Sequence, residues 1–141
     1  MSWLKSMMEK EPKEPENPIG TVVIGNIQPD MHDTAKEAVR KALKRAGFKT
    51  IDVGKSAPPQ VFIDKIKETN ANILAISVNT VPAKNNLAKL DEALKSADLK
   101  DKVTIIMGGA AVKKEDAEAI GALFGKNKEE GVKLAKDAVG K

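Results

Sequence analysis

Short runs of apolar, β-branched residues alternate along this chain with longer segments that have helical periodicity. The first run, Thr21–Ile27, is nearly all apolar, which is typical of a strand buried on both faces of a parallel sheet. Residues 34–46 follow, with Ala35 and Val39 on one stripe of a predicted helix. Gly47 then stands where a glycine commonly ends a helix. A strand followed by a helix in this way predicts a βαβ architecture.

The same alternation continues to the C-terminus. Strands are predicted at residues 21–27, 50–53, 72–78, 103–107 and 122–124, and helices at 34–46, from 58 through 66, 82–97, 115–119 and 128–139. Strands and helices at this spacing indicate right-handed crossovers and a parallel sheet. Five strands predict an α/β fold of the flavodoxin-like (Rossmann-like) type, with strand order 2-1-3-4-5 and helices on both faces of the sheet.

The N-terminal residues differ in composition from this pattern. The segment Glu11–Pro18 carries three prolines among charged residues, which is typical of an extended linker. Before it, apolar residues would share one face of a short helix: Trp3, Leu4, Met7 and Met8. This helix is either a frayed tail or a docking helix for a second subunit or a ligand. We therefore expect a helical segment and linker at 1–19, followed by one domain at 20–141.

Composition excludes several functional classes. The chain has no cysteine, so it forms no disulfides and has no thiolate chemistry. It has no apolar run of the roughly 18 residues that a membrane span needs, and its N-terminus becomes polar too soon for a signal peptide. The net charge is +4, but three Phe, one Trp and no Tyr leave few aromatic side chains to stack on bases. We expect a cytoplasmic protein that binds neither membranes nor nucleic acid.

The predicted topology brings three chemically suggestive segments to one edge of the sheet. With this strand order, the connections after the first and third strands diverge, and a crevice opens at the carboxyl ends of the strands. These ends carry residues 30–33, 77–80 and 108–109. His32 is the only histidine in the chain, and Asp30 precedes it by two residues. Histidine is the commonest metal ligand, and a nearby carboxylate can determine which ring nitrogen stays free.

A single histidine limits the metal chemistry. A zinc enzyme needs three or four protein ligands, which this chain does not offer. A macrocycle fills the equatorial positions with its own nitrogens, so one axial histidine is enough. From spacing alone, an Asp-x-His loop is more often a local hydrogen-bonded turn than a ligand site. Both interpretations remain open at this point.

Other functions of the same fold fit the residues poorly. A response-regulator receiver needs an acid at the end of the third strand, where the chain has Ser77 and Asn79. A flavodoxin needs a phosphate-binding loop after the first strand, but residues 28–31 are acidic. Ser77 also lacks the base and the flanking glycines of a serine hydrolase.

Together these motifs resemble the cobalamin-binding domain of methionine synthase and of the small corrinoid proteins of methyltransferase systems. That family carries Asp-x-His-x-x-Gly after the first strand, Ser-x-Leu after the third and Gly-Gly after the fourth. The corresponding residues here are Asp30-Met31-His32-Asp33-Thr34-Ala35, Ser77-Val78-Asn79 and Gly108-Gly109. The resemblance extends from about Gly20 to the C-terminus.

The resemblance implies a cobalamin cofactor whose nucleotide tail extends into the domain. His32 would be the lower axial ligand to cobalt, held by Asp30. Ser77 and Thr80 would lie against the base of the tail, and the two glycines would let the tail pass close to the backbone. The implied cofactor-binding residues are Asp30, Met31, His32, Asp33, Thr34, Ala35, Ser77, Asn79, Thr80, Gly108, Gly109 and Ala110. No catalytic residue is expected.

The chain departs from the family pattern in three respects. Ala35 replaces the motif glycine and Asn79 replaces the leucine. Both substitutions touch the tail pocket, so we hypothesise that the pocket accepts a different lower base or holds the tail less deeply. In addition, only 19 residues precede the domain, where methyl-carrying relatives have a helical bundle over the cobalt. The upper face of the ring would be open, capped by the N-terminal segment, or covered by a partner or a second copy.

The implied function is that of a corrinoid carrier and not of an enzyme. The protein would carry a methyl group between partner corrinoid-dependent methyltransferases, with a reductive activator as a further candidate partner. Two alternatives remain. The protein could store or deliver cobalamin, or it could be a degenerate domain that serves as a sensor or interaction module.

Overall fold

Five parallel strands form the centre of the computed structural model, which describes residues 10–141. The predicted helix at residues 3–8 lies outside the described residues. The strands are β1 (Thr21–Ile27), β2 (Lys49–Ala57), β3 (Ile73–Ser77), β4 (Thr104–Gly108) and β5 (Leu123–Phe124). They are ordered β2-β1-β3-β4-β5, and every neighbouring pair is parallel. The strand order predicted from the sequence is thus confirmed.

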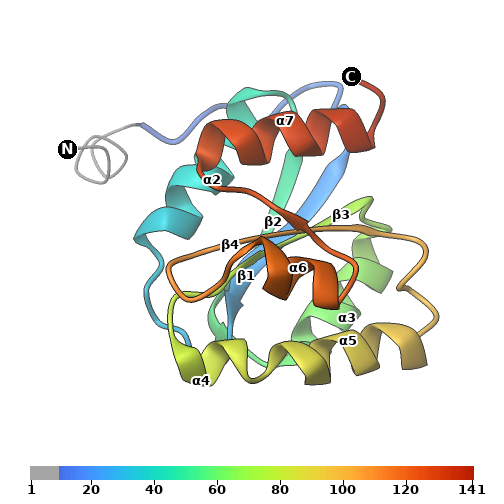
Figure 1. Ribbon diagram of the computed structural model, residues 1–141. Coiled ribbons are helices and arrows are strands. Elements are labelled where there is room, and N and C mark those ends of the chain that lie inside the picture. The colour runs from blue at the N-terminus through green and yellow to red at the C-terminus, as the bar shows by residue number, and fades with distance from the viewer. Residues whose placement is uncertain (1–9) are drawn as a thin grey trace.

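Helices cover both faces of the sheet (Figure 1). They are α2 (Thr34–Arg45), α3 (Pro59–Thr69), α4 (Val81–Lys84), α5 (Leu87–Ser96), α6 (Lys114–Ala119) and α7 (Lys128–Ala138). Helices α2 and α7 pack together on one face, and α3 and α5 pack together on the other. Alternate residues of β1 point to opposite faces: Val22 belongs to the core beneath α2 and α7, and Val23 to the core beneath α3 and α5. Burial on both faces explains why the strands are almost continuously apolar.

The single helix predicted over residues 82–97 is wrong, because α4 and α5 are separate helices. Asn85 and Asn86 lie between them, and asparagine is a poor helix former because its amide competes for backbone hydrogen bonds. The Asn86 amide donates instead to the carbonyl oxygen of Gln28. The break therefore links α5 to the loop that follows β1.

Strand β2 is longer than predicted and supports the same loop. It extends to Ala57, past a register shift opposite Gly25. Beyond that shift, the Ser56 backbone N–H donates to the Asp30 carbonyl oxygen at 2.8 Å. The loop after β1 is thus held by main-chain hydrogen bonds before any side chain contributes.

The proline-rich segment contains no helix or strand over residues 10–18. Glu11 pairs with Arg40 at 2.6 Å and with Lys44 at 2.8 Å, and Glu14 pairs with Lys44 at 2.9 Å. These ion pairs hold the segment against α2. Within the described part of the chain, no helix is long and apolar enough to cross a membrane.

Replacing Glu11 with Gln should lower stability in a pH-dependent way. Side-chain hydrogen bonds from Arg40 and Lys44 lower the pKa of Glu11 to about 2. A lowered carboxyl pKa stabilises the fold above the group's ordinary pKa of 4.5, and this contribution is lost as the pH falls towards 2. Glu11 is half exposed, so the loss at pH 7 should be less than about 1 kcal/mol. Urea unfolding of the variant and the wild type at pH 7 and near pH 2 would measure this difference in the free energy of unfolding.

The Glu11→Gln variant should become indistinguishable from the wild type near pH 2. The matched control is Glu16→Gln, which changes an exposed acid of the same segment. A difference of the same size at both pH values would show that the ion pairs are not responsible.

Candidate functional site

The carboxylate of Asp30 lies at the centre of the edge where β1, β3 and β4 end. It is completely buried. Its Oδ1 accepts a hydrogen bond from the backbone N–H of His32 at 3.0 Å and lies 3.2 Å from His32 Nδ1. Its Oδ2 accepts from the side-chain amide of Asn26 at 3.2 Å. Both the backbone N–H and the side-chain amide of Asn79 also donate to Oδ2, each at 2.9 Å.

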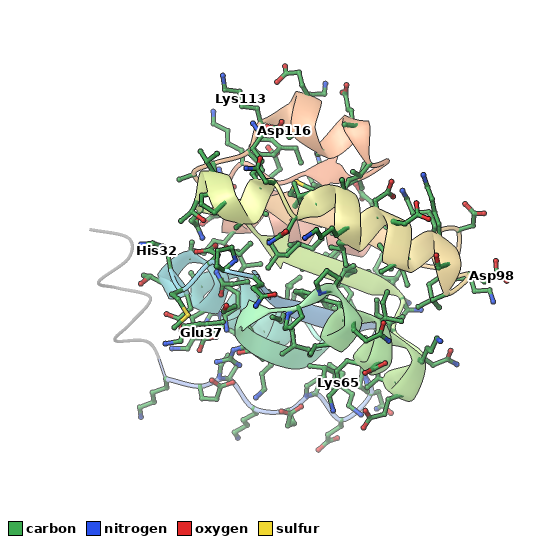
Figure 2. All side chains as sticks on the ribbon, turned by 90° about the horizontal axis from the view of Figure 1, so that it is seen from below. His32, Glu37, Lys65, Asp98, Lys113 and Asp116 are labelled. Carbon is green, nitrogen blue, oxygen red and sulfur yellow. The ribbon has the colours of Figure 1, made fainter. Side chains whose placement is uncertain are left out.

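These donors keep the buried carboxylate ionised. Burial raises the pKa of Asp30, but the hydrogen bonds from His32, Asn26 and Asn79 outweigh burial, and the net pKa lies below its ordinary value. An ionised carboxylate only accepts hydrogen bonds, so it assigns the ring proton of His32 to Nδ1. Nε2 then carries the free lone pair. The His32 side chain is 72% exposed and lies at the margin of the molecule (Figure 2).

The side-chain amides of Asn26 and Asn79 donate hydrogen bonds to the same two atoms. Asn26 Nδ2 donates to Asp30 Oδ2 and to the His32 carbonyl oxygen, and Asn79 Nδ2 donates to the same two atoms. Asn26 Oδ1 is buried without a hydrogen-bond partner among the described residues. Turning the amide over would place this oxygen against two acceptors, so the orientation is fixed. An unpaired buried acceptor costs about 1–3 kcal/mol, which indicates that the loop is held at some expense of stability.

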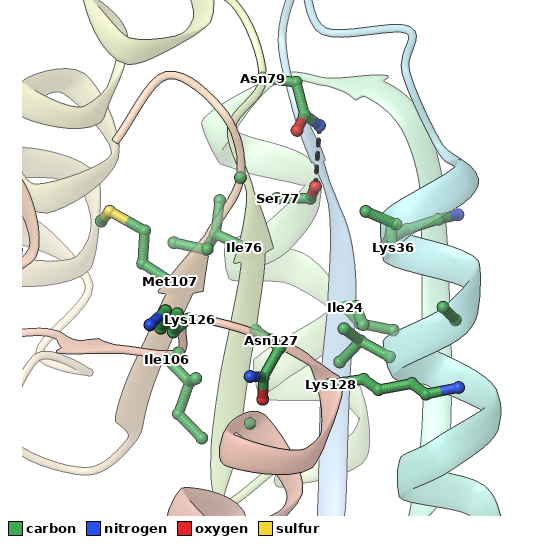
Figure 3. Close-up of a pocket in the computed structure, with 18 of the residues that line it drawn as sticks. Ile24, Lys36, Ile76, Ser77, Asn79, Ile106, Met107, Lys126, Asn127 and Lys128 are labelled. Carbon is green, nitrogen blue, oxygen red and sulfur yellow. Dashed lines mark hydrogen bonds between the residues drawn. The ribbon is translucent and has the colours of Figure 1, made fainter. Parts of the chain in front are cut away.

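A cavity of about 620 Å³ lies beside this cluster, between the sheet, α2 and the start of α7 (Figure 3). Ile24, Ala75 and Ile106 form its apolar floor. The residues predicted from the sequence that line it are Thr34, Ala35, Ser77, Asn79, Gly108, Gly109 and Ala110. An apolar cavity with a few polar groups at its mouth suits an organic ligand.

The other predicted residues lie outside the cavity lining. Asp30 is buried next to the cavity, and His32 projects from the loop beside it. Met31 is 57% exposed, and Asp33 precedes α2 without a side-chain capping bond. The role of Thr80 against a tail base stays a prediction, and the structure shows a further role for its hydroxyl group. Its hydroxyl oxygen accepts from the backbone N–H of Ala83 at 3.3 Å and so caps α4.

The two glycines at the end of β4 are required by the packing of the chain on itself. A Cβ on Gly109 would lie 2.1 Å from the Val78 carbonyl oxygen, and this residue has φ +126°. A Cβ on Gly108 would lie 2.8 Å from the Gly125 carbonyl oxygen. Gly109 therefore lets the loop after β4 approach the segment after β3, and Gly108 lets the end of β4 approach the segment after β5. Both glycines also line the cavity.

The sequence analysis did not predict one wall of the cavity, nor Asn26 as one of the residues that donate hydrogen bonds to Asp30. The missed wall runs from Phe124 to Asn127 and includes the start of α7, which Asn127 caps through the Glu130 backbone N–H. The spacing of Asn127 and Glu130 is a recognisable helix-start signal. Asn26 could have been found as the polar residue in an otherwise apolar buried strand.

Comparison with known proteins agrees with this geometry. A model of the B12 binding domain matches residues 20–133. The chain belongs to the B12-binding domain family. This confirms the resemblance inferred from the three sequence motifs, and it confirms a corrinoid as the kind of cofactor.

The relatives are corrinoid proteins and cobalamin-binding proteins. Trimethylamine corrinoid protein 1 of Methanosarcina acetivorans is 38% identical over 128 residues, which cover 90% of this chain and 59% of that protein. A cobalamin-binding protein from Desulfitobacterium hafniense superposes with a TM-score of 0.81 at 28% identity, over 84% of this chain and 58% of that one.

A third match supports the fold alone. The methanol:cobalamin methyltransferase complex of Methanosarcina barkeri contains a chain that superposes with a TM-score of 0.83 at 20% identity, over 96% of this chain and 51% of that one. The present chain spans about three fifths of the length of the curated relatives that it matches.

Replacing Gly109 with Ala should be far more damaging than replacing Gly54 with Ala. Both glycines have positive φ values, but a Cβ on Gly54 would meet nothing within 4 Å. Gly54→Ala should therefore cost only the backbone strain, about 1–2 kcal/mol. Gly109→Ala adds a clash with the main chain and should cost at least about 3 kcal/mol. Urea unfolding of the ligand-free protein would compare them, and equal losses would contradict the packing role of Gly109.

Proposed function

We propose that this protein is a corrinoid carrier that binds cobalamin with His32 as the lower axial ligand. The observation that carries the proposal is the exposed imidazole, whose Nδ1 lies 3.2 Å from a buried carboxylate. The apolar cavity of about 620 Å³ opens beside that loop. A corrin ring provides the equatorial nitrogens, so a single protein nitrogen completes the ligand set.

The residues of the chain have distinct parts in this proposal. Asp30 would hold the ring proton on Nδ1 of His32, direct Nε2 towards the metal and increase the basicity of the ligand. The cavity would shelter the nucleotide tail between the sheet and α2. Ser77 would contribute a hydroxyl group to its lining, and Ala110 an apolar side chain. The bound corrinoid would supply a cobalt ion that can accept a methyl group and release it.

We also propose that the methyl group is exchanged with partner methyltransferases. This part is supported by the relative named for trimethylamine and by the family match. The largely exposed His32 ring leaves the site accessible from outside. A reductive activator, a homodimer that covers the ring and a cytoplasmic location remain predictions of the same proposal.

Reconstitution with hydroxocobalamin should yield a coloured protein that keeps the cofactor through desalting. Its visible spectrum should differ from that of free hydroxocobalamin, because imidazole replaces water or the tail base on cobalt. His32→Ala should keep much of the colour through the cavity, but its spectrum should lose the histidine contribution. Absorbance spectra of both proteins after identical desalting are the measurement.

A wild-type protein that emerges colourless would overturn the carrier proposal. A spectrum that is identical in wild type and His32→Ala would remove His32 as the ligand but retain cofactor binding. Methyl uptake from trimethylamine, with the bound cobalt first reduced to Co(I) by an added chemical reductant and with a corrinoid-dependent methyltransferase present, would test the carrier role separately. Binding without methyl uptake would favour storage or delivery.

A further inference from the structure

Asn79 joins three segments that meet at the edge of the sheet. Its Nδ2 lies 2.9 Å from Asp30 Oδ2, 3.1 Å from the His32 carbonyl oxygen and 3.0 Å from Ser77 Oγ. Its Oδ1 accepts from the Ala110 backbone N–H at 3.1 Å. Figure 3 shows the bond to Ser77 at the end of β3. One side chain thus connects the loop after β1, the end of β3 and the loop after β4.

The polar atoms of this amide are already used within the protein. Two N–H groups face three acceptors, and the oxygen has its own donor. Little hydrogen-bonding capacity is left for a ligand in the cavity, although Asn79 lines it. These bonds therefore indicate a structural role for Asn79, while its effect on the lower base or on the depth of the tail stays a prediction. A leucine, as in the family pattern, could make none of these bonds.

Asn26 and Asn79 are not equivalent. Both amides donate to Asp30 and to the His32 carbonyl oxygen. Asn26 is fully buried within β1, and Asn79 also lines the cavity and anchors Ala110. Asn79 is therefore the member of the pair that contacts both the histidine loop and the space expected to hold the tail.

We infer that Asn79 is a positioning residue that holds the loop of Asp30 and His32 ready to present the imidazole before any nucleotide tail enters the cavity. The inference rests on the proposed function. A loop fixed in advance loses less conformational entropy when the metal binds, so the ligand is presented more often. Without the amide, the loop would keep its main-chain bonds and those of Asn26, but it would be held less firmly, and a bound tail would contribute more to ordering it.

Cobinamide is a corrinoid without the nucleotide tail, so it separates the contribution of the Asn79 amide to histidine ligation from the contribution of the tail. In the Co(II) state, an axial nitrogen splits the electron paramagnetic resonance lines into triplets, and ligation can be read without any activity. Wild-type protein with cobinamide should show this nitrogen signature, and His32→Ala should not. Asn79→Leu should reduce the ratio of histidine-ligated to unligated cobinamide at least tenfold. With full cobalamin, the same variant should regain most of its ligation.

Two further variants keep the test decisive. Asn85→Leu makes the same substitution at an exposed position on the neighbouring turn and should behave like the wild type. Asn79→Ser removes the amide but leaves a small polar side chain, and it should show the same loss of histidine ligation. It replaces Asn79→Leu in the test if the leucine variant does not fold. Circular dichroism and urea unfolding would show which variants are folded.

The outcomes distinguish the inference from the proposed function. Failure of the wild type to retain either corrinoid would overturn the proposed function. If the wild type ligates both corrinoids and folded Asn79 variants match it with cobinamide, the positioning role is wrong and the carrier function stands. A wild type that ligates cobalamin but not cobinamide would also overturn the inference, because the loop would then need the tail.

Discussion

A carboxylate that is fully removed from water must be matched by hydrogen-bond donors, and this requirement organises the site. Asp30 obtains its donors from Asn26 within β1, from His32 two residues later and from Asn79 after β3. These groups meet only because β1 and β3 are neighbours, with Asn26 opposite Ser77 in the sheet. The topology of the sheet is therefore a condition for the ionised state of one side chain. That state in turn determines which nitrogen of the histidine is free.

The loop after β4 completes the arrangement through the main chain. Val78 donates its N–H to the Gly108 carbonyl oxygen at 2.9 Å, and its own carbonyl oxygen accepts from Ala111 at 3.2 Å. Gly109 is in contact with the backbone of Val78 between these bonds. Gly109 thus has two roles, because it lets the segments after β3 and β4 pack closely and it also lines the cavity.

How much could be predicted from the sequence depends on whether a feature is local. The strands and their order follow from the apolar runs, and the convergence of Asp30, Ser77 and Gly108 at one edge follows from that order. The break between α4 and α5 is not predicted, because the helical periodicity of the apolar residues continues across Asn85 and Asn86. The capping bond of Thr80 could not be predicted either, because it depends on where α4 begins. Both features depend on local competition for hydrogen bonds.

The saturated amide of Asn79 was beyond sequence reasoning for a different reason. Its partners come from the loop after β1, the end of β3 and the loop after β4, and only their spatial arrangement shows that little polar capacity remains. The far wall of the cavity, at the start of α7, depends in the same way on packing between distant segments.

The unpaired oxygen of Asn26 has a consequence for how such a protein could be improved or impaired. This oxygen has no hydrogen-bond partner among the described residues, and its burial costs stability. A smaller apolar residue would remove that cost, but it would also take one donor from the buried carboxylate of Asp30. The same amide therefore carries a liability on its oxygen and a necessary bond on its nitrogen, which leaves little room for substitution at this point of the first strand.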